Sequence, residues 1–199
     1  MTQQSPTFIA FAGPQRFAQG PIDAVARAVH ARQAAQDATG KPELILIFDA
    51  ASSALVDLDL RGDAEEAAAR ARARFAPPAE EARGRGRPKL GVEAHEVTLL
   101  PRHWEWLRAQ PGGASIALRK LVEAAARDPR QEARRAQDAA YKFMHAIGGD
   151  LPDYEEATRA LFARDGAGFA ARIAGWPDDI RAHAQALAAP AFTQTGAAK

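Results

Sequence analysis

The chain has 199 residues, of which 47% are hydrophobic and 26% are charged, and its formal net charge is +1. This length allows a real hydrophobic core, in one domain or in two to three small units. The near-neutral charge excludes a generic binder of polyanions, so any contact with nucleic acid must be local. The lack of cysteine excludes disulfides, thiol nucleophiles and Cys-ligated zinc.

Targeting and membrane signals do not stand out in this sequence. Residues 1–20 contain no basic segment followed by an apolar run, and no apolar stretch reaches membrane-spanning length. We therefore expect a cytoplasmic protein with no membrane partner.

The N-terminal part, residues 1–75, reads as a small α/β unit with the element order β-α-β-β-α. The predicted elements are strands at 7–12, 44–48 and 56–60 and helices at 22–38 and 63–75. A helical crossover would make the first two strands parallel, and the third would return as a hairpin. The strand at 44–48 is apolar on both faces, which is typical of a central strand.

An acidic cluster follows the second predicted strand. Asp57 and Asp59 would share one strand face with Asp49 nearby, as a divalent-metal site would need. Neither a histidine nor a further acid is spaced to complete the set, so a solvated strand face is the favoured interpretation. No metal and no cofactor are expected, and an enzyme using this face is the third and least favoured function.

Residues 76–92 read as an exposed linker rich in Pro, Gly and Arg. Its basic part alternates cations with glycine and proline; the cations are Arg83, Arg85, Arg87 and Lys89. The core Arg85-Gly86-Arg87-Pro88 resembles an AT-hook, which implies contact with a narrow A/T-rich minor groove. The alternative is a solvated Gly/Arg linker without a ligand.

The segment 93–128 predicts a strand, a helix, a glycine turn and a second helix. Val97 and Leu99 alternate with polar residues over 95–100, which favours a half-buried strand. Pro101 is suited to the first position of a helix, and Pro111-Gly112-Gly113 ends that helix. Leu118, Leu121, Val122 and Ala125 then form an apolar stripe at helical spacing, and Asp128-Pro129 ends it.

This order of elements resembles a ribbon-helix-helix module. The resemblance implies a homodimer whose paired strands enter the major groove of DNA, where Thr98 and Arg102 would work. The dimer core would contain Val97, Leu99, Trp104, Leu107, Leu118, Leu121 and Val122. Glu96 could accept from a cytosine amine but would be repelled by phosphates, and Leu100 offers no hydrogen bond. The family usually has one more residue between its apolar alternation and the helix, so the strand register stays open. The alternative is a module of the same shape that dimerises without reading DNA.

The remaining chain predicts a helical region over 129–190 and a frayed tail over 191–199. The expected helices cover 131–147, 154–163, a short stretch around 169–176, and 177–189. The fold class is therefore α+β, with a ribbon-helix-helix-like middle and a helical C-terminal region.

Three runs together resemble an uncharacterised bacterial family, a domain of unknown function of about 200 residues. They are Gly86-Arg87-Pro88-Lys89-Leu90-Gly91, the run from Val97 to Leu107, and Gly149-Asp150-Leu151-Pro152 with the run from Glu155 to Phe162. The resemblance implies no known activity. From the residues, the leading hypothesis is a DNA-binding protein, with transcriptional regulation as its role. The second is a non-enzymatic interaction or dimerisation protein, and neither identifies a small-molecule effector.

Overall fold

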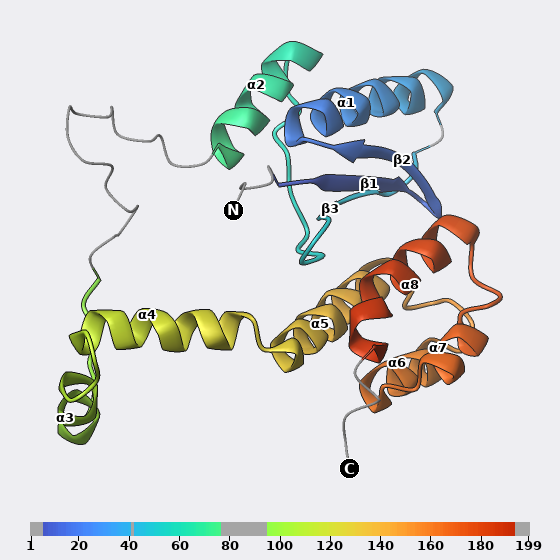
Figure 1. Cartoon of the computed structure of the whole chain (residues 1–199). Helices are drawn as coiled ribbons and strands as arrows, with labels where there is room; N and C mark the ends of the chain where they lie inside the picture. Colours follow the sequence, from blue (N-terminus) through green and yellow to red (C-terminus); the bar gives the residue numbers. More distant parts are fainter. Residues whose placement is uncertain (1–5, 41, 77–94, 194–199) are drawn as a thin grey trace. The chain divides into compact units, whose positions relative to one another are not determined.

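The computed structural model describes residues 6–40, 42–76 and 95–193 and confirms the α+β class (Figure 1). The chain forms two compact units. The main unit comprises residues 1–76 and 132–199, and the helix-pair unit comprises residues 77–131. The basic run and most of the expected linker, within residues 77–94, lie outside the described residues.

A three-stranded antiparallel sheet forms the middle of the main unit. Its strands are β1 (Phe8–Ala12), β2 (Gln15–Gly20) and β3 (Ile45–Asp49), in the order β2-β1-β3. A bulge at Phe17 interrupts the register between β1 and β2. All five residues of β1 are buried, so the first strand, and not β3, is the central one.

Two helices cover one side of this sheet. They are α1 (Ile22–Thr39) and α2 (Ala64–Phe75). Gly40 ends α1 in a left-handed conformation, with its N–H donating to Gln36 O. Asp63 begins α2 with a reciprocal capping box to Glu66, which satisfies N–H groups that a helix start leaves unpaired.

Four helices cover the opposite side: α5 (Pro129–Ile147), α6 (Tyr154–Ala163), α7 (Gly166–Arg172) and α8 (Asp178–Phe192). The sheet lies between the two helical layers (Figure 1), and alternate residues of β1 belong to different apolar cores. Phe8 and Ala10 pack with α1 and α2, whereas Ile9 and Phe11 pack with the C-terminal helices. The main unit thus has three layers and two apolar cores.

Two side-chain hydrogen bonds link segments of the C-terminal helical layer to one another, one between helices and one between the residues that connect them. Buried Gln137 on α5 donates to the carbonyl oxygen of Leu161 on α6 at 3.0 Å. The indole N–H of Trp176 donates to Pro152 O at 2.7 Å. Each bond satisfies a polar group that would otherwise cost free energy inside the core.

The helix-pair unit contains α3 (Pro101–Arg108) and α4 (Gly113–Ala126). Pro101 is the first residue of α3, as the sequence predicts. The turn between the helices needs positive φ at two successive positions, 86° at Gly112 and 75° at Gly113. Glycine adopts this conformation without a steric penalty.

Three predictions for the N-terminal part were wrong. The strand β2 was not predicted, because Gln15–Gly20 is mostly polar and reads as a loop. The strands at 8–12 and 45–49 are antiparallel, not parallel. The helical crossover instead joins β2 to β3, which run parallel to each other with β1 between them. Residues 56–60 form no strand. The nearest strand-like pairing is an isolated bridge between Leu55 and Phe48.

Two predictions for later segments were also wrong. Residues 95–100 form no strand, because within one chain the described residues offer them no partner strand. The expected frayed tail includes residues that are packed: α8 continues through Pro190, Ala191 is buried, and the Phe192 ring lies 5.4 Å from that of Phe169.

The division into units also differs from the expected one. The sequence separates 1–75 from 129–190, whereas the structure places them around one sheet.

Candidate interaction site on the helix pair

The residues expected to contact DNA fall into two groups. Arg83, Arg85, Arg87 and Lys89 lie outside the described residues. Thr98 and Arg102 are described and exposed, on the segment before α3 and in its first turn. Their exposure leaves both accessible to a ligand.

The expected dimer core is mostly not buried within one chain. Of its members only Leu107 is buried, at 3% exposure. Leu99, Trp104 and Leu118 are half-buried. The others are exposed, namely Val97 at 53%, Leu121 at 49% and Val122 at 65%. The residues chosen for a dimer core therefore remain available to a partner.

The helix-pair unit buries very little of its own apolar surface. Among its described residues, Leu107 and Ala117 are the only buried hydrophobic side chains. Helices of eight and fourteen residues are marginal in water without tertiary packing, because nucleating a helix is costly. A core of one leucine and one alanine provides little of that packing.

Exposed large hydrophobic side chains are concentrated in the same unit. Six of the ten found in the described chain belong to it: Val97, Leu100, Trp106, Ile116, Leu121 and Val122. A scattered exposed leucine needs no explanation, but a concentration of this kind is typical of an interaction site. The helix-pair unit is therefore the strongest candidate site in the described chain.

In the acidic cluster of the main unit, the Asp59 carboxylate is paired with arginines. Asp59 accepts from Arg61 Nε at 2.9 Å and from a second guanidinium nitrogen at 2.7 Å, and Arg70 Nε lies 3.5 Å away. The Arg61 guanidinium holds the pKa of Asp59 far below its usual range. In the described part of the chain, no group of three or more His, Asp or Glu side chains could hold a metal ion.

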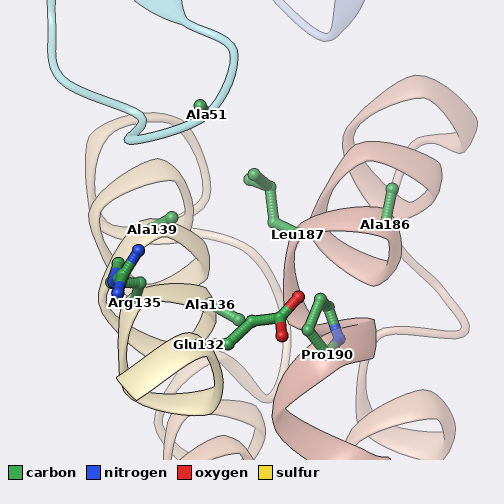
Figure 2. A pocket seen from close by; sticks show the side chains of 8 residues that line it. All are labelled: Ala51, Glu132, Arg135, Ala136, Ala139, Ala186, Leu187 and Pro190. Atoms are coloured by element: carbon green, nitrogen blue, oxygen red, sulfur yellow. The ribbon is translucent and has the colours of Figure 1, made fainter. Parts of the chain in front are cut away.

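A shallow pocket of about 250 Å³ lies between α5 and α8 in the main unit (Figure 2). The residues that line it are Ala51, Glu132, Arg135, Ala136, Ala139, Ala186, Leu187 and Pro190. Its walls are mostly small apolar side chains, and the Glu132 carboxylate points toward α8 near Pro190. Ligand pockets usually occupy about 300–1,000 Å³ and enclose most of their ligand, so this open hollow is a weaker candidate.

His183 on α8 is a buried histidine in a structural environment. Its ring lies 4.6 Å from Phe143 and 5.8 Å from Phe11 between ring centroids, and its Nε2 has no hydrogen-bond partner. Burial, with a smaller contribution from the nearby Arg16 charge, lowers the pKa of His183 to about 4. The ring is therefore a neutral core residue at physiological pH.

A surface cluster of aromatic rings on α5 and α6 was missed by the sequence reasoning. Tyr141 stacks on His145 with centroids 5.7 Å apart, and Phe162 lies 5.6 Å from Tyr141. His145 Nδ1 is 3.2 Å from the Tyr154 hydroxyl. The spacing of Tyr141 and His145, four residues apart on one helix, was a signal that could have found their contact.

No helix among the described residues is long and apolar enough to cross a membrane. Comparison with curated proteins and with solved structures finds no significant match for this chain. A family model does match, over residues 7–188 of the 199. The chain belongs to this family, described as an uncharacterised protein conserved in bacteria, DUF2239.

Proposed function

We propose that this protein is an interaction protein that docks a macromolecular partner on the apolar surface of its helix-pair unit. The observation that carries the proposal is the imbalance within the described part of that unit, which has two buried hydrophobic side chains and six large exposed ones. Docking would remove most of the exposed side chains from water and give α3 and α4 the packing that they lack.

The distribution of side chains around α4 supports docking through one face. At 3.6 residues per turn, Leu118, Leu121, Val122 and Ala125 share one side of the helix, which we call the α4 stripe. The charged side chains of Lys120, Glu123 and Arg127 lie on the opposite side, and Arg119 lies at the edge of the stripe. A partner can therefore cover the stripe without removing these charges from water, which would be costly.

Hydrogen exchange on dilute purified protein tests this proposal. We expect amides of α3 and α4 to exchange quickly, while those of β1, buried at every position, stay protected. Slow exchange of α3 and α4 in a protein shown to be monomeric would contradict the proposal, because the unit would then be stable without a partner.

DNA binding is a second candidate function, favoured by the distribution of charge. Residues 77–131 contain ten Lys and Arg against seven Asp and Glu, whereas the rest of the chain contains sixteen against eighteen. Four of those cations fall between Arg83 and Lys89. Neutralising phosphates would release condensed counterions, which is the main source of non-specific affinity for DNA.

A further inference from the structure

We infer that the partner docked on the helix-pair unit is a second copy of this chain, with the two α4 helices antiparallel and a two-fold axis passing between Leu121 and Val122. The inference rests on the proposed docking function and names its partner. It follows from the order of side chains along the α4 stripe, from the position of charge around α4, and from the amount of exposed apolar surface.

The α4 stripe is complementary to itself when one copy is reversed. With a two-fold axis between positions 121 and 122, Leu121 of one copy faces Val122 of the other. Leu118 then faces Ala125, so a large side chain meets a small one at both ends. Such an interface is isologous, in that the same patch serves both copies, and it forms a closed dimer.

The charges of α4 allow this approach. Two copies with equal net charge repel each other, but Lys120, Glu123 and Arg127 are exposed on the side of α4 away from the stripe, and exposed Arg119 lies at the edge of the stripe. None of them is buried when the stripes meet, and water screens the repulsion between them. DNA is a poorer occupant of the stripe, because an apolar surface offers nothing to phosphates.

The available apolar surface is sufficient for a dimer only if α3 contributes. Leu121 and Val122 alone would bury roughly 400 Å² in total between two copies, which is below the ~1,000 Å² expected of a specific interface. Adding Val97, Leu100 and Trp106 raises the total to roughly 1,000 Å². We therefore place Trp106, which is 52% exposed, in the same interface.

Light scattering and sedimentation over a wide range of protein concentration provide the first test. The wild-type mass should double as concentration rises, and Leu121→Asn with Val122→Asn should weaken dimerisation at least tenfold. Trp106→Ala should weaken it similarly. Ile116→Asn is the matched control, since Ile116 is also apolar and exposed but lies on the opposite side of α4. A wild type that stays monomeric, or a control as weak as the stripe variant, overturns the inference.

Exchange of charge across the axis tests the antiparallel arrangement. Leu121→Lys and Val122→Glu should each dimerise poorly alone. Mixed together, they should form a heterodimer in which the introduced lysine of one copy faces the introduced glutamate of the other, seen as the mixed mass by native mass spectrometry. Circular dichroism of each variant checks that the main unit is folded. Dimers of the wild type without preferential pairing in the mixture overturn this arrangement.

Hydrogen exchange separates failure of this inference from failure of the docking proposal. Protection of α3 and α4 that rises together with the dimer mass supports both. Fast exchange in a protein that stays monomeric leaves the docking proposal standing and overturns the second copy. Slow exchange in a monomer overturns both. Binding of the monomer to anionic lipid vesicles, abolished in the stripe variant, would make a membrane surface the occupant and likewise overturn the second copy.

Discussion

The backbone N–H of Arg16 donates a 2.9 Å hydrogen bond to the carboxylate of Asp179, 163 positions later in the chain. Arg16 lies on the edge strand β2, and Asp179 lies in the first turn of α8. The bond satisfies an amide on an edge strand, where backbone groups are otherwise left unpaired. It also joins the N-terminal sheet to the last helix of the main unit.

Replacing Asp179 with alanine should lower the free energy of unfolding by about 1 kcal/mol, because the Arg16 amide loses a charged acceptor near the surface. Chemical denaturation measures this change. Asp178→Ala is the control, since Asp178 is also in the first turn of α8 but its side chain is 88% exposed and forms its ion pair with the nearby Arg181. Equal effects of the two substitutions would show that the Arg16 contact is unimportant.

Burial of His183 should make the protein less stable in mild acid. Its pKa is about 4 in the folded protein and near 6.5 in the unfolded chain. The unfolded chain therefore binds the proton first, and stability falls as pH drops from about 6.5 to about 4. The loss should reach about 3 kcal/mol and then stop growing, because both states are protonated.

His183→Phe should remove this part of the pH dependence, which unfolding experiments at a series of pH values can measure. Carboxylates such as Asp23, Asp59 and Glu65 have lowered pKa values, and the stability that they contribute is lost toward still lower pH. The difference between wild type and variant isolates the histidine. Parallel pH profiles for the two proteins would contradict the prediction.

Divalent metal should not raise the melting temperature through the acidic cluster, because Arg61 and Arg70 already neutralise Asp59. Asp59→Asn should lower the melting temperature more than Asp57→Asn, since Asp59 is the one whose carboxylate pairs with both arginines. Thermal unfolding with and without metal tests both statements. A metal-dependent rise in the wild type that disappears in Asp59→Asn would restore the interpretation as a metal site.

If the second candidate function is correct, replacing Arg85, Arg87 and Lys89 with alanine should weaken binding to all DNA sequences. The slope of log affinity against log salt should fall by roughly two to three, at about 0.9 for each phosphate that is no longer neutralised. Mobility shifts at several salt concentrations measure this slope. Thr98→Ala should leave the slope unchanged, and a wild type that shifts no duplex at low salt would exclude DNA binding.

Helices were predictable from the sequence because their signals are local. Pro101, the glycine turn before α4 and the apolar spacing of α5 and α6 each act within a few residues, and the structure confirms the helices they indicated. The concentration of apolar residues in 95–126 was likewise visible, although their exposure was not. Exposure depends on what else packs nearby, which no local pattern contains.

Strand order and layering were decided only by tertiary structure. The sequence of β1, Phe-Ile-Ala-Phe-Ala, is apolar on both faces of the strand. This pattern predicts that both faces are covered, but it does not identify the elements that cover them. One face is covered by α5 to α8, more than a hundred residues later in the chain, which pack on Ile9 and Phe11.

The polar strand β2 forms because the turn at Gly13 and Pro14 brings it beside β1, where backbone pairing does not depend on side-chain polarity. By itself, the sequence determined where most of the helices lie, because capping and periodicity are short-range, although α7 begins before its predicted stretch and α8 extends past its predicted end. The pairing of strands and the sharing of one core by both ends of the chain are long-range contacts that only the folded structure selects.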